Sequence, residues 1–168
     1  MRLTLECTPG SILALMAECC CSQPADTAST FGCSACRTKG SPVDELTVKA
    51  LLTEVALQRF EAGVYRFCPD ASCDVVYFDT AGRTFTTTDL RVPVWQKAPP
   101  GARMICYCFG ENETDIEAEV ERTGGSKAVE RVRAHIDAGR CACDVRNPKG
   151  ACCLGDVMQA VQRMTRHG

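Results

Sequence analysis

The sequence predicts an α+β fold made of two small units, one with a helix on an antiparallel hairpin and one built from short helices. Three observations lead to this prediction. Strand-like runs flank Cys68 and Cys73, apolar residues recur at helical spacing elsewhere, and 13 of the 14 cysteines lie in short clusters among 168 residues. The core of the first unit is too small to be stable alone, so its cysteines are expected to hold a structural metal ion.

The chain divides into four segments where its composition changes. Residues 1–30 are expected to form a flexible, cysteine-rich tail because Ser, Pro, Ala and Thr are frequent there. Residues 31–95 form the predicted α+β domain, and residues 103–168 form the predicted helical domain. Two prolines and a glycine in residues 96–102 mark the linker between them.

The first domain is expected to begin with one amphipathic helix over about residues 45–60. Its apolar face consists of Val48, Leu51, Leu52, Val55 and Ala56, which recur at helical spacing. Charged residues take the other face, so this helix should pack one side on a sheet.

A small antiparallel sheet should follow the helix. Runs rich in Val, Tyr, Phe and Thr occur at residues 64–67, 74–78 and 84–87. The turn at residues 79–83 joins the last two runs into a hairpin. Residues 90–95 fit an edge strand, because Pro93 cannot donate to a central ladder.

The second domain should contain three short helices. Thr114–Glu117 fits a capping box at the start of the first helix, and Gly124–Gly125 stops it. Ser126 caps the second helix, which ends at Gly139. The third helix carries the apolar residues Leu154, Val157, Val161 and Met164.

Four cysteines of the first domain have the spacing of a zinc site. Cys33 and Cys36 form a Cys-x-x-Cys knuckle, and Cys68 and Cys73 form a second pair 32 residues later, which together supply a tetrahedral Cys₄ site. Neighbours this close cannot readily bridge each other but can share a metal ion, so metal binding is favoured over disulfides. A thioredoxin-like redox motif is the alternative, but the second pair and the missing βαβ pattern disfavour it.

A second cysteine group lies in the helical domain. Cys106 and Cys108 form one Cys-x-Cys pair, and 34 residues separate Cys108 from Cys143, which precedes the adjacent Cys152 and Cys153. Thiolates brought together from such loops are what a [2Fe–2S] cluster needs, since four cysteine sulfurs normally hold it.

These strings resemble the N-terminal region of the CopZ-type copper chaperones. The shared features are Cys106-Tyr-Cys108, the run from Cys143 through Asn-Pro-Lys-Gly to Cys153, and the run Phe67-Cys-x₄-Cys-Asp-Val-Val-Tyr-Phe78. The helical half also resembles bacterioferritin-associated-ferredoxin-like domains. The likeness covers about residues 31–156.

The resemblance implies a set of cluster ligands. Cys106, Cys108 and Cys143 match its pattern directly, and the fourth ligand is Cys152 or Cys153. Cys141 has no counterpart there, which leaves a spare thiol, a rescue ligand or a small core residue as its role.

The tail contains the adjacent thiols Cys19, Cys20 and Cys21. They could capture a soft cation such as Cu(I), because sulfur ligands select such metals. A thiol-rich tail without a fixed site is the preferred interpretation, since adjacent residues seldom all reach one ion in relaxed geometry.

Composition excludes several classes of function. The net charge of −2 and the aromatic content of 6% give no surface for binding nucleic acid. No apolar run reaches the length of a membrane span, and Glu6, Pro9 and Gly10 interrupt the only segment like a signal peptide, so a cytoplasmic protein is expected. No nucleophile–base pair or phosphate loop is evident, which favours an electron-transfer and metal-binding protein over a classical enzyme.

By resemblance, the expected function is one-electron transfer in copper or soft-metal handling. The implied cofactors are Zn²⁺ and a [2Fe–2S] cluster, and the implied reaction is reduction of Cu(II) to Cu(I) upstream of a copper chaperone or copper-transporting ATPase. No heavy-metal-associated domain follows Cys153 in this sequence, so direct copper delivery is not expected. The alternative is a ferredoxin-like partner that reduces another metalloprotein, such as a ferritin-like protein.

Overall fold

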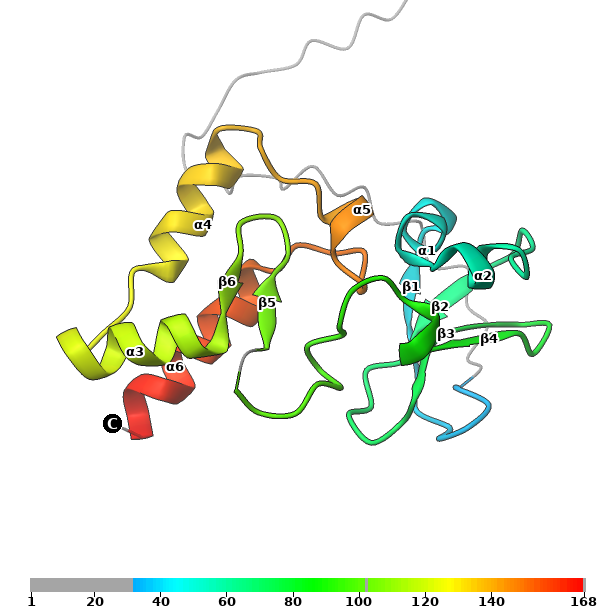
Figure 1. The fold of residues 1–168 in the computed structure, drawn as a ribbon, viewed down its shortest axis with the longest axis horizontal. Helices are drawn as coiled ribbons and strands as arrows, with labels where there is room; N and C mark the ends of the chain where they lie inside the picture. Colours follow the sequence, from blue (N-terminus) through cyan, green and yellow to red (C-terminus); the bar gives the residue numbers. More distant parts are fainter. Residues whose placement is uncertain (1–31, 102, 168) are drawn as a thin grey trace, which may run out of the picture.

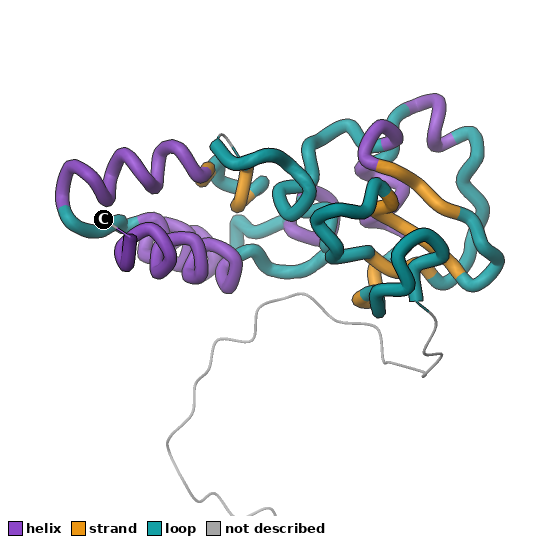
Figure 2. Tube along the Cα trace, turned by 90° about the horizontal axis from the view of Figure 1, so that it is seen from below, coloured by secondary structure: helices purple, strands orange, loops and turns teal. Residues whose placement is uncertain are grey.

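The structure is a computed structural model that describes residues 32–101 and 103–167. Strands lie mainly in one half of the molecule and the longer helices in the other, which confirms the α+β fold class (Figures 1 and 2). No helix in the described part of the chain is long and apolar enough to cross a bilayer. Outside the described residues lie Cys7, Cys19, Cys20 and Cys21. The soft-metal hypothesis for the tail therefore stays a prediction.

The first half is a four-stranded antiparallel sheet in the order β1-β2-β3-β4. The strands are β1 (Ser41–Val43), β2 (Tyr65–Phe67), β3 (Val75–Asp79) and β4 (Thr84–Thr86). The central strand β3 is buried along its whole length. Tyr77 belongs to the main core, whereas Phe78 packs with Cys33, Cys68 and Cys73. The sheet therefore separates an apolar core from a cysteine cluster.

Two short helices replace the single helix expected over residues 45–60, so that expectation is wrong. They are α1 (Glu45–Leu51) and α2 (Glu54–Leu57). The chain leaves the helix at Leu52, whose ψ of 144° is extended. Thr53 then begins α2, because its hydroxyl accepts a hydrogen bond from the amide of Ala56.

This break also turns one expected core residue outward. Leu52 forms an isolated bridge with Leu90, and the amide of Thr53 donates to the carbonyl of Asp89. Val55 is 73% exposed instead of facing the sheet. The edge strand expected over residues 90–95 is wrong too, because Leu90 alone makes a bridge and a 3₁₀ turn, η1 (Thr87–Asp89), precedes it.

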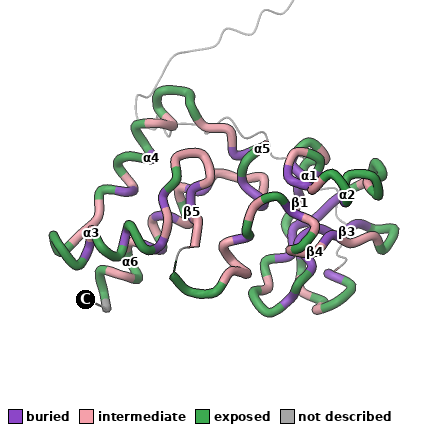
Figure 3. Tube along the Cα trace, in the orientation of Figure 1, coloured by how far each residue is buried: buried purple, intermediate pink, exposed green. Residues whose placement is uncertain are grey.

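The second half packs three helices around a small hairpin. Its elements are β5 (Met104–Cys106), β6 (Glu111–Asn112), α3 (Glu113–Thr123), α4 (Ala128–Asp137), α5 (Cys143–Arg146) and α6 (Leu154–His167). Ile105, Ile116, Val132 and Val157 are fully buried in its core, which includes cysteines as well. Buried positions recur along both halves of the chain (Figure 3). The helices α3, α4 and α6 are the three expected ones, whereas the hairpin and α5 were not expected.

The helix ends show which capping signals operate. The capping box expected at Thr114–Glu117 is wrong, because the side chain of Asn112 caps α3 by accepting from the amide of Asp115. Gly124 ends this helix in the left-handed conformation, with φ of 77°. The N-cap of α4 is Lys127, not Ser126 as expected, although the hydroxyl of Ser126 accepts a hydrogen bond from the amide of Ala128.

Arg131 on α4 joins two carboxylates. Its guanidinium donates two hydrogen bonds of 2.8 Å to Glu111, which is only 8% exposed, and longer ones to Glu119. Hydrogen bonds from Arg131 and Ser126 lower the pKa of Glu119 to about 2, so that carboxylate is charged at neutral pH.

We expect Arg131→Met to lower the free energy of unfolding by about 1–3 kcal/mol, because Glu111 would be left buried without its charged donor. Denaturant unfolding measures the loss. Arg133→Met removes an exposed charge from the same helix and is the matched control. Equal stability of the two variants would contradict the prediction.

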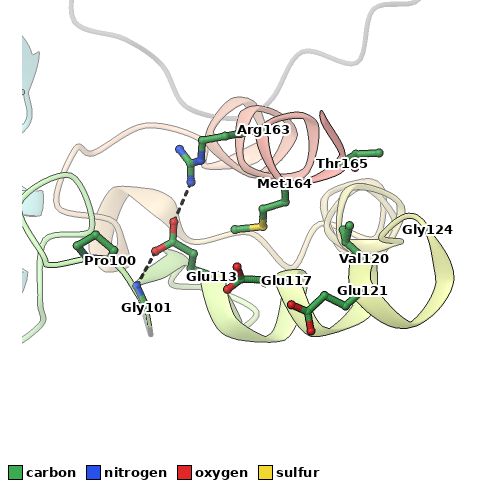
Figure 4. A pocket seen from close by; sticks show the side chains of 10 residues that line it. All are labelled: Pro100, Gly101, Glu113, Glu117, Val120, Glu121, Gly124, Arg163, Met164 and Thr165. Carbon is green, nitrogen blue, oxygen red and sulfur yellow. Dashed lines mark hydrogen bonds and ion pairs between the residues drawn. The ribbon is translucent and has the colours of Figure 1, made fainter. Parts of the chain in front are cut away.

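A cavity of about 660 Å³ lies between α3 and α6 (Figure 4). Glu113 closes one end of it, accepting hydrogen bonds from the amide of Gly101 and from Arg163. The side chain of Met164 points into the space. Glu113 therefore ties the start of the second half to its last helix.

The two halves meet where α1 packs against α5 (Figure 1). The hydroxyl of Tyr77, from the centre of the sheet, donates a 2.8 Å hydrogen bond to the carbonyl of Pro148. Gly150, with φ of 65°, approaches so closely that a Cβ there would lie 3.1 Å from both Thr47 and Val43. The sheet thus supports the turn that leads to Cys152 and Cys153.

We expect Tyr77→Phe to cost about 1–2 kcal/mol, because the buried Pro148 carbonyl loses its donor. Tyr65→Phe is the control, since it removes a hydrogen bond to Glu61 within the first half. Both variants should lose stability, but only Tyr77→Phe should speed amide hydrogen exchange at residues 147–153. Equal exchange in the two variants would count against this coupling.

Candidate metal centres

The first cysteine group sits in two tight loops at one side of the sheet. In the first loop the amide of Arg37 donates to the carbonyl of Cys33, and Arg37 itself takes a positive φ of 65°. In the second loop the amide of Cys68 donates to Val76, at the end of the β2–β3 pair. Asp70 tightens this loop by accepting from the amide and hydroxyl of Ser72.

The structure brings all four sulfurs of this group together. The Sγ atoms of Cys33, Cys36, Cys68 and Cys73 lie within 4.8 Å of one another. Cys33 and Cys73 are 3.8 Å apart, and Cys36 and Cys68 are 3.6 Å apart. Zinc–sulfur bonds of about 2.3 Å in a tetrahedron place the sulfurs about 3.8 Å apart, so the arrangement fits a zinc ion.

Three of these thiols have pKa values shifted by their surroundings. A hydrogen bond with Thr38 lowers the pKa of Cys36 to about 7, although burial opposes it. Burial raises the pKa values of Cys68 and Cys73. Because a bound cation deprotonates coordinating thiols outright, it would make all of them ligands at neutral pH.

Lys97 supports the second loop from outside. Its ammonium group donates to the carbonyls of Asp70, at 2.6 Å, and Cys73, at 2.8 Å. Its charge also lowers the pKa of Cys68, against the larger effect of burial. Sequence reasoning placed Lys97 in a linker and missed this role, since nothing in the local pattern links it to a loop 24 residues earlier.

We expect Lys97→Gln to release zinc several-fold faster to a chelator, because groups that hold ligand loops in place typically change metal affinity by about 10- to 100-fold. The release can be followed with a chromogenic zinc chelator. Lys39→Gln makes the same charge change at an exposed position beside the first loop. Equal release rates would contradict a role for Lys97.

The second cysteine group comes from three loops of the helical half. Cys106 ends β5, Cys141 and Cys143 precede and begin α5, and Cys153 immediately precedes α6. Asn147 shapes the last loop by donating to the carbonyl of Ala151 and accepting from the amide of Lys149. This turn brings the chain back toward β5.

The predicted cluster ligands in this group form two close sulfur–sulfur contacts. Cys106 and Cys153 are 2.7 Å apart, and Cys108 and Cys143 are 3.7 Å apart. Cys106, Cys143 and Cys153 are at most 1% exposed. Cys152, by contrast, is partly exposed. The structure therefore brings together Cys153, rather than Cys152, with the predicted ligand Cys106.

The chemistry of these donors suits iron. Four thiolates are the usual ligands of a [2Fe–2S] cluster, and the two contacts supply four sulfurs. Contact with Cys143 and burial raise the pKa of Cys108, and contact with Cys106 raises the pKa of Cys153. Without a cation these thiols hold their protons, which metal binding would release.

Tyr107 lies between Cys106 and Cys108 in the sequence, but its hydroxyl forms hydrogen bonds with the backbone of another segment. Its hydroxyl donates to the carbonyl of Pro93 at 2.7 Å and accepts from the amide of Trp95 at 2.9 Å. It therefore anchors the segment that joins the halves.

Comparison with known proteins places the chain. A family model of the CopZ type, described as a zinc binding domain, matches residues 31–91. The copper chaperone CopZ of Archaeoglobus fulgidus is 35% identical over 121 residues, which are 72% of this chain and 57% of that protein. The chain thus spans little more than half the length of this curated relative.

A solved structure gives the same result for the fold. The X-ray structure of the Archaeoglobus fulgidus CopZ N-terminal domain is 32% identical, with a TM-score of 0.64. The match covers 77% of this chain and 96% of that domain. The chain belongs to the CopZ family, as a homologue of its zinc-binding N-terminal domain.

Proposed function

We propose that this protein carries a structural zinc ion and a [2Fe–2S] cluster and transfers single electrons in copper handling. Zinc is held by Cys33, Cys36, Cys68 and Cys73, and the cluster by Cys106, Cys108, Cys143 and Cys153. The observation that carries the proposal is the pairing of four sulfurs from three loops, in a chain whose relative is named a copper chaperone.

The chain's own residues prepare the second site for this role. When bound, a [2Fe–2S] cluster takes up and gives up one electron at a time. Burial of Cys106, Cys143 and Cys153 keeps water away from three of the sulfurs. The amide of Ala142 donates to the sulfur of Cys108 at 3.4 Å, a contact that favours the thiolate.

The substrate of the proposed reaction is Cu(II), reduced to Cu(I) by one electron before it passes to a copper chaperone or an export ATPase. Cys108 is the partly exposed member of the four and gives the site a side open to solvent. A cytoplasmic location suits this proposal, because reduced thiols are maintained there.

The alternative, reduction of a ferritin-like or other metalloprotein, would use a charged docking face. Arg131 and Arg163, on α4 and α6, are instead paired with carboxylates of their own chain. No contact in the described residues favours that alternative, so copper is the proposed substrate.

Anaerobic purification with metal and sulfide analysis tests the cofactors. About two irons, two sulfides and one zinc per chain are expected, with a rhombic electron paramagnetic resonance signal after one-electron reduction. Zinc in both sites after iron–sulfide reconstitution would overturn the proposal.

A second assay tests the reaction. Protein reduced with dithionite and then desalted should convert about one Cu(II) per cluster to Cu(I), trapped by a Cu(I)-specific chelator. Thiols can reduce copper as well, so the zinc-loaded, cluster-free protein is the control. Equal Cu(I) yields with and without the cluster would exclude a redox role for it.

A further inference from the structure

Cys141 is a fifth thiol beside the proposed cluster ligands. Its sulfur lies 3.2 Å from that of Cys143. The sulfurs of Cys108, Cys141 and Cys143 all lie within 4.8 Å of one another, whereas Cys106 and Cys153 contact each other. Four sulfurs are enough to ligate a [2Fe–2S] cluster, so the proposed function assigns no role to Cys141.

We infer that Cys108, Cys141 and Cys143 form a three-thiolate site for one soft monovalent cation, with Cu(I) as its occupant. With metal–sulfur bonds of about 2.3 Å, three sulfurs around one ion lie about 4 Å apart. The separations of 3.2 Å and 3.7 Å need only small side-chain adjustments to reach this value.

The donor set selects the class of metal. Thiolates favour Cu(I), zinc and iron–sulfur centres over hard cations. A structural zinc site uses four ligands, and the four-sulfur group of the first half supplies that number. Three thiolates suit a monovalent ion that needs fewer ligands.

The site is also open on one side. Cys108 and Cys141 are partly exposed, whereas Cys143 is buried. Arg140, which immediately precedes Cys141, is exposed as well. A cation, or a carrier that exchanges it, can therefore reach two of the sulfurs from solvent.

Two of the three thiolates are shared with the proposed cluster. Cys108 and Cys143 cannot serve both centres at once, so a chain that holds Cu(I) here cannot hold the cluster. This exclusion rests on the proposed function, but binding of Cu(I) to the trio does not. The region would thus take iron or copper according to which is available.

A pair of variants separates the two centres. Cys141→Ser should lose Cu(I) binding and keep cluster assembly, because it removes a member of the trio alone. Cys106→Ala should do the reverse, and alanine suits that fully buried position. Cys152→Ser is the matched control for loss of a partly exposed thiol outside the trio.

The measurement is anaerobic titration of the full-length, zinc-loaded and cluster-free chain with up to one equivalent of Cu(I), against a chromogenic Cu(I) chelator. Cys7, Cys19, Cys20 and Cys21 are replaced by alanine throughout, so that tail thiols do not compete. Zinc content after titration verifies that the first site is untouched.

We expect Cys141→Ser to weaken Cu(I) binding by at least about 10-fold, while Cys106→Ala and Cys152→Ser stay near the parent. Reconstitution with iron and sulfide should then fail only for Cys106→Ala. Unchanged Cu(I) affinity in Cys141→Ser overturns the inference, as does failure of that variant to assemble a cluster. If the parent protein also assembles no cluster, the proposed function is wrong. The Cu(I) titration still tests whether Cys108, Cys141 and Cys143 bind Cu(I).

Discussion

The Cys68→Ser variant will lose its zinc and unfold in the sheet half of the protein. Cys68 is fully buried, and its sulfur lies 3.6 Å from that of Cys36 in the four-sulfur group. Structural zinc contributes about 10–16 kcal/mol of apparent binding free energy in small zinc domains. Loss of one ligand should therefore remove several kcal/mol, a large part of the stability of such a domain.

Loss of zinc should also destabilise the core of the sheet half, through Phe78 and Val75. Both pack directly against the cysteines, and Phe78 lies in the same strand as Tyr77. Removal of zinc would leave the buried thiols without a cation and would loosen β3. Because Tyr77 holds Pro148, iron retention in the second half should fall as well.

The experiment combines zinc analysis, near-ultraviolet circular dichroism and thermal unfolding. Cys152→Ser, a serine substitution at a partly exposed cysteine, controls for the general effect of such a change. A Cys68→Ser protein that keeps one zinc and the parent's melting temperature would exclude a structural role for this site.

The parts of the fold that the sequence predicts are those with local signals. Alternating Val, Tyr and Phe beside Cys68 and Cys73 predict β2 and β3, which the structure confirms. The apolar periodicity from Val129 to Ile136 and from Leu154 to Met164 likewise predicts α4 and α6. Each of these segments carries its own pattern of burial.

The failures involve contacts between distant residues. The helix break at Leu52 depends on its bridge to Leu90 and on a hydrogen bond from Thr53 to Asp89, some 36 residues away. The same pairing takes Leu90 out of the expected edge strand. Periodicity within residues 45–60 contains no information about either partner.

In the candidate sites, too, the sequence predicts what depends on local spacing and not what depends on contacts between distant residues. Spacing alone groups Cys33 with Cys36 and Cys68 with Cys73, and the structure brings these sulfurs together. Spacing cannot choose between adjacent cysteines, because Cys152 and Cys153 differ only in which way each side chain turns from the last loop. That choice depends on packing against Cys106, which the folded chain alone provides.

The Cys153→Ser variant will fail to assemble a [2Fe–2S] cluster, whereas Cys152→Ser will assemble it normally. Cys153 is 1% exposed and lies 2.7 Å from Cys106, while Cys152 is partly exposed. Cys153 also precedes α6, and the amide of Val157 donates to its carbonyl. Its backbone is therefore fixed by the helix, which holds the sulfur toward Cys106.

Reconstitution with iron and sulfide, followed by visible absorption, measures this difference. Changes outside the ligand shell typically cost about 10- to 100-fold in metal affinity, so loss of a ligand should reach or exceed that range. Far-ultraviolet circular dichroism of both variants separates loss of the cluster from loss of the fold. Retention of the cluster in Cys153→Ser but not in Cys152→Ser would make Cys152 the fourth ligand instead. The side chain of Cys153, just before α6, would then have to point away from Cys106.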